Sequence, residues 1–391
     1  MPRYKYLILG GGMTGDSAVK GIREIDKEGS IGLISDEKYP PYSRPPLTKD
    51  LWKGSELDKI WRKTDEYNIT LHLSTHITRL DAENRYLVDD KGNKYEFEKL
   101  LLATGGRPIK LPFGSEDIIY YRRLSDYNNL RSISETDKTF AIIGGGFIGT
   151  EIAAALTMNG KEVTMIFPEK FLGERIYPLD LAQFLTGFYS EKGVRMISGD
   201  AVTEIEEEKS SFFVGTGSGK NVTADCVIAG LGIRPNTMLA EEAGIAVNNG
   251  ILIDEYLRTN INYIYAAGDV ANIYNPSLER RIRIEHADNA DKMGKSAGIS
   301  MAGKGEPFNY LPFFYSDMFD LGYEAIGELH STYDIVSDWQ EPFKKGVIYY
   351  SQNDKVRGVL LWNVWGKIKD ARELIGSKRT IKPEELKGLI E

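Results

Sequence analysis

Tyr6-Leu-Ile-Leu-Gly10-Gly-Gly12-Met-Thr-Gly15 is the stretch that decides the fold, because an apolar run breaks there into three spaced glycines. The run predicts a buried parallel strand, and the helix expected after it has Ala18 on its inner face. Gly10 allows a tight turn, Gly12 lets the backbone approach a pyrophosphate, and Gly15 lets the helix pack closely on the strand. The free N–H groups of the helix N-terminus would then point at phosphate. Glycine-rich turns of this kind also occur without a ligand.

A second copy lies 134 residues further on, at Phe140-Ala-Ile-Ile-Gly144-Gly-Gly146-Phe-Ile-Gly149-Thr-Glu151. It again joins an apolar run to G-x-G-x-x-G and then to an alanine-rich helical segment. Two copies in one chain predict two bound dinucleotides.

Each copy is followed by a second strand that ends in an acid. Asp36 lies 21 residues after Gly15, and Glu169 lies 20 residues after Gly149. At this distance a carboxylate at the end of the second strand reaches the 2′-hydroxyl of an adenosine ribose. The alternative is a pair of ordinary βαβ units with solvated acids at their turns. The matched spacing favours two ribose-binding acids.

Length and composition limit the protein class. The chain has 391 residues, 41% apolar and 27% charged, which is typical of a soluble globular protein with two or three domains. Its net charge of −8 and the lack of a long Lys/Arg run argue against a nucleic-acid partner. No apolar run approaches the ~18 residues of a membrane span, so no membrane association is expected. The first strand begins within a few residues of Met1, and we therefore expect a cytoplasmic protein without a targeting peptide.

Cysteine and histidine usage excludes two kinds of site. The one cysteine, Cys226, lies in an apolar strand and is interpreted as a small buried hydrophobe. With no second cysteine there can be no redox-active dithiol and no all-protein iron–sulfur cluster. The four histidines have no spacing typical of a metal site, and no metal is expected.

Tyr39-Pro-Pro-Tyr-Ser-Arg44-Pro-Pro-Leu-Thr-Lys49-Asp-Leu-Trp52 contains four prolines, which predict an extended and rigid segment. Arg44 and Lys49 are fixed cations within it. Beside a phosphate-binding turn they favour a cationic clamp, and the alternative is a proline-rich connector with solvated charges. A β-rich stretch follows from 69 to 95, with a hairpin signal at 91–93.

Buried strands end in small-residue turns at Ala103-Thr-Gly105 and at Gly268-Asp269. Small residues allow close backbone approach to a cofactor, although a plain strand end would also tolerate them. Asp269 is an acceptor for ribityl or ribose hydroxyls, and we expect a helix directly after it.

The remaining segments complete the expected outline. The second dinucleotide unit runs from about 118 to 235, with a hairpin tip at 216–220. Residues 309–391 are rich in aromatic side chains and predict a smaller α+β domain. Strands are expected at 346–350 and 356–362, and an amphipathic helix from Lys367.

Six motifs, read in order, cover the chain from end to end: GGGMTG, PYSRPPLTK, ATGGRP, GGGFIGTE, LGIRPN and YAAGDVA. Together they resemble the two-dinucleotide flavoprotein reductases, which have an FAD domain, an inserted NAD domain and a C-terminal interface domain. That family includes NADH-dependent ferredoxin and rubredoxin reductases and the apoptosis-inducing factor type, to which the resemblance is strongest. From this sequence we expect no targeting sequence, no basic surface composition and no long C-terminal insertion. DNA binding and an apoptotic role are therefore not expected. We expect instead a prokaryote-style cytoplasmic reductase.

The resemblance implies a fold class and a domain division. The fold is α/β, with two Rossmann-like dinucleotide-binding domains of the glutathione-reductase type and a C-terminal α+β domain. The FAD-binding domain comprises 1–114 and 237–308, the NAD-binding domain 115–236, and the interface domain 309–391.

The resemblance also implies which residues act. Gly10, Gly12 and Gly15 hold the FAD pyrophosphate, Asp36 its adenosine ribose, and Arg44, Lys49, Thr104, Arg107 and Asp269 the rest of FAD. Gly144, Gly146, Gly149 and Glu169 hold NAD. Glu285, His286 and Tyr315 line the cofactor cleft. The other cofactor-binding candidates are Met13, Thr14, Glu37, Ile77, Ala103, Gly105, Phe147, Ile148, Lys170, Arg175, Gly232, Gly268 and Ala287.

Lys49 and Glu151 are the catalytic candidates. The implied chemistry is hydride transfer from nicotinamide C4 to flavin N5, with Lys49 near N5 and Glu151 orienting it. Tyr315 stands where the resembled group has a tryptophan, in Phe314-Tyr-Ser-Asp317, and a tyrosine can still stack. NADH should be preferred over NADPH because Glu169 would repel a 2′-phosphate, although Lys170 and Arg175 lie near enough to weaken this.

Three functions stay open from the sequence. The first is an NADH reductase that passes electrons to a ferredoxin- or rubredoxin-type protein or to a small oxidant. The second is an apoptosis-inducing-factor-like, NADH-gated binding module with slow turnover. The third, a disulfide or peroxide reductase, is nearly excluded by the single cysteine. A homodimer is possible on any of these readings.

Overall fold

The structure is a computed structural model that describes residues 1–390. Its internal contacts divide the chain into two compact units, and each is built from separated segments. The first unit comprises Met1–Arg44, Leu57–Arg107 and Arg234–Phe313. The second comprises Pro45–Glu56, Pro108–Ile233 and the chain from Phe314 onward. The short segment Pro45–Glu56, which carries Lys49, therefore belongs with the second unit.

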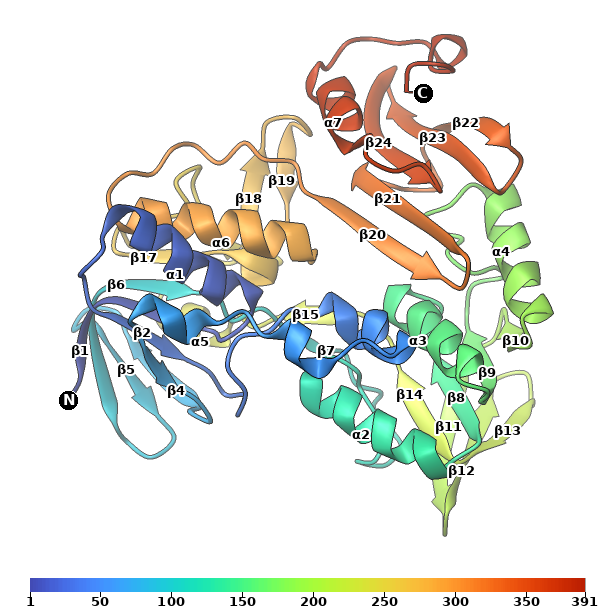
Figure 1. Ribbon diagram of the computed structural model, residues 1–391, viewed down its shortest axis with the longest axis horizontal. Coiled ribbons are helices and arrows are strands. Elements are labelled where there is room, and N and C mark those ends of the chain that lie inside the picture. The colour runs from blue at the N-terminus through green and yellow to red at the C-terminus, as the bar shows by residue number, and fades with distance from the viewer. Residues whose placement is uncertain (391) are drawn as a thin grey trace. The chain divides into compact units, whose positions relative to one another are not determined.

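The first unit is built on a seven-stranded mixed sheet (Figure 1). Its strands, in spatial order, are β3 (Thr70–His72), β2 (Ile31–Ile34), β1 (Arg3–Leu9), β6 (Lys94–Leu102), β5 (Tyr86–Asp89) and β4 (Ile77–Asp81), with β17 (Ile264–Ala266) paired to β6. Strands β1, β2, β3, β6 and β17 pair in parallel, whereas β4 and β5 form antiparallel hairpin pairs. The central strands are apolar throughout because both faces are covered, and Leu7 and Leu100 have no exposed surface.

Helix α1 (Met13–Ile25) and helix α6 (Ala287–Met301) lie side by side in this unit, although more than 260 residues separate them (Figure 1). Glycines make this close approach possible. A Cβ on Gly21 would overlap the carbonyl oxygen of Lys295, and one on Gly298 would overlap that of Ala18. The two backbones are thus in direct contact, which fixes α6 beside the first glycine-rich turn.

Three sheets make up the second unit. The first is parallel, in the order β10 (Arg195–Ser198), β9 (Glu162–Phe167), β8 (Thr139–Ile143) and β14 (Cys226–Ala229). The second is an antiparallel meander of β11 (Val202–Glu208), β12 (Ser211–Thr216) and β13 (Asn221–Ala224). The third is five-stranded, in the order β20 (Phe313–Met318), β21 (Leu321–Gly327), β24 (Lys355–Trp362), β23 (Lys345–Gln352) and β22 (Asp334–Glu341).

The other elements are shorter or flank these sheets. The remaining helices are α2 (Leu124–Thr136), α3 (Phe147–Met158), α4 (Leu179–Glu191), α5 (Met238–Glu242) and α7 (Ile368–Gly376). The remaining strands are β7 (Gly106–Pro108), β15 (Ile233–Pro235), β16 (Ile251–Leu252), β18 (Ala271–Asn275) and β19 (Arg280–Ile282). The 3₁₀ turns are η1 (Pro45–Thr48), η2 (Asp50–Lys53), η3 (Leu57–Ile60), η4 (Thr64–Tyr67), η5 (Gly268–Val270) and η6 (Pro383–Glu385).

Most predicted elements are confirmed, and two need correction. The strands that open each glycine motif, both hairpin tips, the C-terminal strands and the last helix lie where predicted. The proline segment is not extended beyond Arg44, because Pro45 begins a 3₁₀ turn, a position that tolerates a missing N–H. The helix predicted directly after Asp269 is wrong. Gly268 begins the short 3₁₀ turn η5, strand β18 comes next, and the following α-helix, α6, begins at Ala287.

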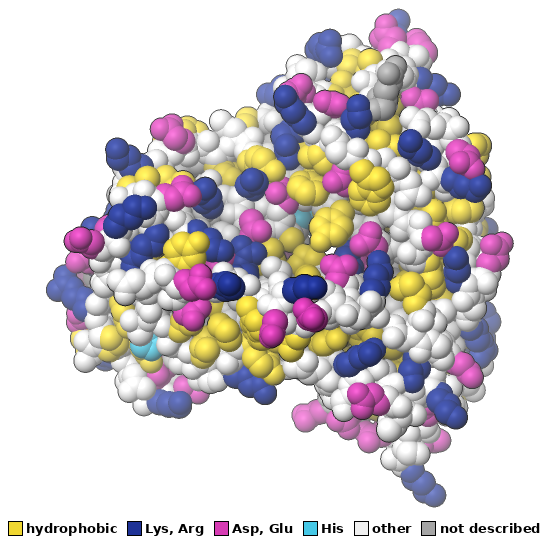
Figure 2. Space-filling model, viewed as in Figure 1, with side chains coloured by type: hydrophobic (Ala, Val, Ile, Leu, Met, Phe, Trp, Pro, Cys, Tyr) yellow, Lys and Arg dark blue, Asp and Glu magenta, His cyan; other side chains and the backbone are white. Residues whose placement is uncertain are grey.

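Charged side chains of both signs are interspersed over the face drawn in Figure 2. On that face Lys and Arg do not gather into a continuous stripe of the kind that binds a phosphate backbone. Within residues 1–390, no helix combines the length and the apolar character that crossing a bilayer requires.

The α1–α6 contact predicts different outcomes for two helical glycines. Gly298→Ala forces a methyl group into the backbone of α1 and should destabilise the protein by about 1–3 kcal/mol. Gly187→Ala, in the middle of α4 with open space around it, should be neutral or stabilising by up to about 1 kcal/mol. Thermal melting of both variants tests this. Equal melting temperatures would show that α1 and α6 are not in close contact.

Candidate functional site

The first glycine-rich turn joins β1 to α1 and leaves open space at one glycine only. Gly10 has φ +129°, and a Cβ there would overlap the carbonyl oxygen of Ala103. A Cβ on Gly15 would overlap the carbonyl oxygen of Gly10. A Cβ on Gly12 would meet only one atom, Nη2 of Arg44, at 3.9 Å. The first glycine is therefore in close contact with the backbone just after β6, and the third with the end of β1, whereas the middle one faces a space next to a cation.

The second turn, between β8 and α3, repeats this arrangement. Gly144 has φ +106°, and its Cβ would overlap the carbonyl oxygen of Gly230. A Cβ on Gly149 would overlap the carbonyl oxygen of Gly144. A Cβ on Gly146 would meet nothing within 4 Å. Two turns about 134 residues apart in sequence thus share one local geometry.

Both open glycines are helix N-caps. Gly12 caps α1 and Gly146 caps α3, and neither helix receives a side-chain hydrogen bond at its cap. The first N–H groups of each helix therefore point at the open space beside a glycine. Uncapped N–H groups together with the helix dipole are suited to a phosphate group. The residues present fit the pyrophosphate of a dinucleotide at each turn.

A charged cluster lies at the open side of the first turn. Arg44 Nη2 donates to Oε1 of Glu37 at 2.7 Å, and the Tyr42 hydroxyl donates to Oε2 of the same carboxylate at 2.6 Å. The Arg44 guanidinium also lies over the Tyr42 ring, 5.4 Å from its centroid. Two partners therefore fix the guanidinium in place beside Gly12.

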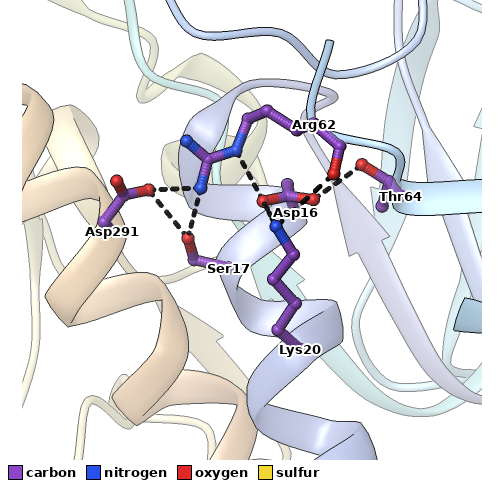
Figure 3. A network of polar contacts seen from close by, with 6 residues as sticks. All are labelled: Asp16, Ser17, Lys20, Arg62, Thr64 and Asp291. Carbon is purple, nitrogen blue, oxygen red and sulfur yellow. Dashed lines mark hydrogen bonds and ion pairs between the residues drawn. The ribbon is translucent and has the colours of Figure 1, made fainter.

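A buried polar network supports α1 directly after this turn. Figure 3 shows its six members, Asp16, Ser17, Lys20, Arg62, Thr64 and Asp291. The fully buried Asp16 carboxylate accepts from Arg62 Nε at 2.5 Å, from Lys20 Nζ at 2.8 Å and from the Thr64 hydroxyl at 2.7 Å. Arg62 continues to Asp291 of α6 at 2.6 Å. The network joins α1, α6 and the segment that carries Arg62, so it holds the start of α1 in place.

The other predicted residues of the first unit lie partly on loops after strands and partly within elements, since Met13 begins α1 and Ile77 begins β4. Thr104 donates through its hydroxyl to the Asn236 carbonyl at 2.9 Å, and the Asn236 amide donates in return to the Thr104 carbonyl at 2.8 Å. Gly268, with φ +76°, packs against Thr14 of the first turn. Asp36 and Arg107 have exposed side chains, and Met13 and Ala103 are buried. Ile77 is 5% exposed and forms part of the hydrophobic core of this unit.

Glu285 and His286 immediately precede α6. Arg283 Nη1 donates to Oε1 of Glu285 at 2.5 Å and to the carbonyl of Asp269 at 3.0 Å. His286 is the N-cap residue of α6 and Ala287 the first residue of this helix. Burial lowers the pKa of His286 to about 4, and the nearby Asp269 carboxylate only partly opposes this. His286 is therefore neutral at pH 7.

The second unit brings the two catalytic candidates into contact. Lys49 Nζ donates to Oε1 of Glu151 at 2.6 Å, and the two side chains are 8% and 5% exposed. The Thr48 hydroxyl donates to Oε2 of the same carboxylate at 2.5 Å, and the Ser316 hydroxyl to Oε1 at 2.6 Å. A buried carboxylate with three donors is a fixed charge rather than a mobile one.

Tyr315 covers the other member of this pair. Its ring centroid lies 5.2 Å from Lys49 Nζ, within the range of a cation–π contact. The side chain is 39% exposed, and burial of the remainder raises the pKa of the Tyr315 hydroxyl to about 12. The tyrosine is thus neutral and contacts both solvent and the buried ion pair.

Beyond β9, Glu169 forms an ion pair with Arg175 at 2.7 Å between Oε1 and Nη2. The Arg175 side chain is 78% exposed and that of Glu169 is 24% exposed. Lys170 is exposed, as is Ile148, at 37%, beside the second turn. Phe147 contacts the Phe314 ring at 5.5 Å between centroids, and Gly232 adopts φ +85°. Glu169, the acid predicted to bind a ribose, is therefore already paired with the cation of Arg175.

The predicted residues fall into two groups, one in each unit. The glycines of the first turn, Arg44 and the residues before α6 belong to the first unit. The glycines of the second turn belong to the second unit, together with Lys49, Glu151, Glu169 and Tyr315. Sequence reasoning missed several polar partners: Asp16, Tyr42, Thr48, Arg62 and Ser316. Tyr42 and Thr48 lie in the proline-rich segment that the sequence already indicated, whereas Asp16, Arg62 and Ser316 belong to no local pattern that points to a site.

The only cysteine is buried in β14, and burial raises the pKa of the Cys226 thiol to about 12. A thiol of this kind stays protonated and is a poor nucleophile at neutral pH. Cys226 is therefore poorly suited to act as a redox-active thiol.

Comparison with known proteins identifies the class of protein to which this chain is similar. The crystal structure of the covalent putidaredoxin reductase–putidaredoxin complex matches 98% of this chain and 95% of its own, with TM-score 0.91 and 28% identity. The fold is therefore a mixed α/β fold of the ferredoxin reductase type. Apoptosis-inducing factor 1, mitochondrial, of Dictyostelium discoideum is 31% identical over 97% of this chain and 79% of its own. Monodehydroascorbate reductase 3 of Arabidopsis thaliana is 34% identical over 92% and 89%.

Residues 4–294 match the family described as pyridine nucleotide-disulphide oxidoreductase, and 337–377 match the C-terminal region described as apoptosis-inducing factor, mitochondrion-associated. The chain belongs to the pyridine nucleotide-disulphide oxidoreductase family. It is an FAD- and NAD(H)-dependent oxidoreductase, as its relatives are.

The pKa of His286 predicts a pH-dependent stability. The ordinary histidine pKa is about 6.5, so between pH 6.5 and 4 the unfolded chain takes up a proton that the folded chain does not. This part of the stability is complete above pH 6.5 and is lost as the pH falls toward 4. His286→Gln should therefore flatten the fall in melting temperature over that window. His330→Gln, at an exposed histidine, is the control and should follow the wild-type curve. Identical curves for all three proteins would contradict the assignment.

Proposed function

We propose that this protein takes a hydride equivalent from NADH onto FAD and passes electrons from there to a small redox protein. One observation carries the proposal. Each of the two glycine-rich turns has a middle glycine that faces open space beside an uncapped helix N-terminus. Two such turns in one chain suit two dinucleotides, and FAD and NADH are the pair that the family uses.

The proposal extends to the domain division. FAD would be bound by a Rossmann-like domain of 1–114 and 237–308, and NAD by a second one of 115–236. Residues 309–391 would form the interface domain of a glutathione-reductase-like, two-dinucleotide fold. Parallel strand pairing around β1 and around β8 supports the first two assignments.

On the FAD side, the N–H groups after Gly12 and the Arg44 guanidinium would hold the pyrophosphate. Asp36, at the end of β2, would bind the adenosine ribose, and Asp269 the ribityl chain. Glu37 and Tyr42 would keep Arg44 in place, because both hold it there already. A fixed cation loses less conformational freedom on binding than a mobile one.

On the NAD side, the N–H groups after Gly146 would hold the pyrophosphate and Glu169 the adenosine ribose. When bound, FAD supplies the acceptor for the hydride and the store of electrons. Lys49 would place its ammonium charge where negative charge develops, and Glu151 would keep the lysine oriented. Tyr315 would shield the pair from water on its open side.

The acceptor class rests on the relatives. A small redox protein is favoured because the matched solved structure is a reductase bound to its redox-protein partner. A small oxidant is the other acceptor, as the name monodehydroascorbate reductase indicates for that relative. A homodimer is compatible with either. The match of 337–377 to the apoptosis-inducing factor C-terminal region favours an NADH-gated binding module as a second candidate. Such a module would hold its reduced flavin instead of discharging it.

Matched substitutions at the two open glycines test the proposal. Both have negative φ values, −88° and −82°, and room for a methyl group, so Gly12→Ala and Gly146→Ala should fold normally. Gly12→Ala should release FAD on gel filtration. Gly146→Ala should stay yellow and need ~10-fold or more NADH for half-maximal reduction. Loss of the same ligand in both variants, or of neither, would contradict the assignment of one dinucleotide to each turn.

The ion pair at Glu169 predicts the coenzyme preference. NADH should be preferred because the carboxylate repels a 2′-phosphate, and Arg175 should moderate this because it neutralises that carboxylate. Arg175→Ala should therefore increase the ratio of kcat/KM for NADH over NADPH by ~10-fold, and Glu169→Gln should reduce it. Steady-state kinetics with both coenzymes measures the ratio. An unchanged ratio in both variants would show that the ribose lies elsewhere.

A further inference from the structure

The Glu151 carboxylate accepts hydrogen bonds from two segments that are distant from it and from each other in sequence. It lies on α3 and is 4% exposed. Thr48 is the last residue of η1 and Lys49 is the residue after it, and both donate to this carboxylate. Ser316 donates to it from β20 of the five-stranded sheet. Both carboxylate oxygens are used: Oε1 accepts from Lys49 and Ser316, and Oε2 accepts from Thr48.

Strand β20 and helix α3 meet in register. Phe147 and Glu151 are four residues apart on the helix, a rise of ~6 Å. Phe314 and Ser316 are two residues apart on the strand, a rise of ~6.6 Å. Because these spacings match, Phe147 contacts Phe314 at 5.5 Å while Ser316 donates to Glu151 at 2.6 Å. The residue spacing of the helix and of the strand therefore allows both contacts to form together.

The same strand contacts both members of the ion pair. Successive residues point to opposite faces of a strand, so Tyr315 and Ser316 lie on different sides. The Tyr315 ring lies over Lys49, and the Ser316 hydroxyl donates to Glu151. Ser316 is 2% exposed, so water does not replace its hydroxyl if it is removed.

We propose that Ser316 and Thr48 are positioning residues for hydride transfer, which fix the Glu151 carboxylate so that it holds Lys49 in one orientation. This rests on the proposed function, since it assigns the task of Lys49 to the flavin. Neither hydroxyl touches the reacting atoms; each acts through Glu151. Ser316 makes the orientation of Lys49 depend on the five-stranded sheet, so that a change at β20 is transmitted to the redox centre.

The test compares Ser316→Ala with Ser351→Ala in the FAD-loaded protein. Ser351 is an equally buried serine of the same sheet, and its hydroxyl donates to the Asp334 carbonyl at 3.2 Å. Ser316→Ala should slow anaerobic flavin reduction by NADH ~10-fold, because a charged group loses a hydrogen bond. It should also make the flavin reduction potential more negative. Ser351→Ala should leave both quantities at wild-type values, while the two variants melt within a few degrees of one another.

Thr48 supplies a conservative rescue. Thr48→Val removes the hydroxyl at nearly constant shape and should slow reduction, whereas Thr48→Ser keeps the hydroxyl and should restore the rate. In a Glu151→Gln background the Ser316→Ala effect should shrink to within ~2-fold, because both changes act through one carboxylate.

Three results would overturn the proposal. Equal flavin reduction rates and equal potentials for Ser316→Ala and Ser351→Ala would show that the Ser316 contact has only a structural role. A full Ser316→Ala effect in the Glu151→Gln background would show a route other than Glu151. Equal rates for Thr48→Val and Thr48→Ser would remove the hydroxyl from the mechanism. If the wild-type protein binds FAD but NADH does not reduce it, the proposed function fails. The potential, measured with a chemical reductant, then decides separately whether Ser316 acts on the flavin.

Discussion

Backbone contact at the first and third glycines of each turn is the constraint on which the rest of the structure depends. No side chain fits between Gly10 or Gly144 and the backbone that follows the neighbouring strand, or between Gly15 or Gly149 and the first glycine of the same turn. The helix is therefore in direct contact with the end of its strand, and the middle glycine is left facing open space. This open space is the one that the proposed function assigns to a dinucleotide. Around the first turn, the glycine contact of α1 with α6 and the buried Asp16 network extend the same rigidity outward.

The buried Lys49–Glu151 pair is the second constraint, and it has a different physical origin. Removing two charges from water is unfavourable unless both are paired and their remaining hydrogen bonds are made. Thr48 and Ser316 supply those bonds, and Tyr315 covers the ammonium group. An apolar pair of similar volume would serve stability equally well. The presence of a fixed charge beside the second glycine turn therefore supports a functional role, since charge held in advance stabilises charge that develops during a reaction.

The sequence patterns predicted the local features of the fold and missed the contacts between residues that are distant in sequence. The glycine turns follow from apolar runs with regular spacing, and the resemblance to a known family implies the pairing of Lys49 with Glu151. The helical form of Pro45–Lys53 was missed because prolines suit both extended chain and the start of a 3₁₀ turn. Arg62 and Thr48 were missed because their partners are 46 and 103 residues away, and no local pattern encodes such distances. The ion pair of Glu169 with Arg175 was visible only as proximity in sequence.

The most direct test of the account is anaerobic stopped-flow mixing of the purified protein with NADH, followed by mixing with a rubredoxin, a ferredoxin or ferricyanide. The proposed function predicts a yellow protein whose flavin absorbance is lost on mixing with NADH and returns rapidly with one class of acceptor. A protein that is reduced but keeps its electrons in the presence of every acceptor would favour the NADH-gated binding module. A protein that binds no flavin, or whose flavin NADH does not reduce, would contradict the account.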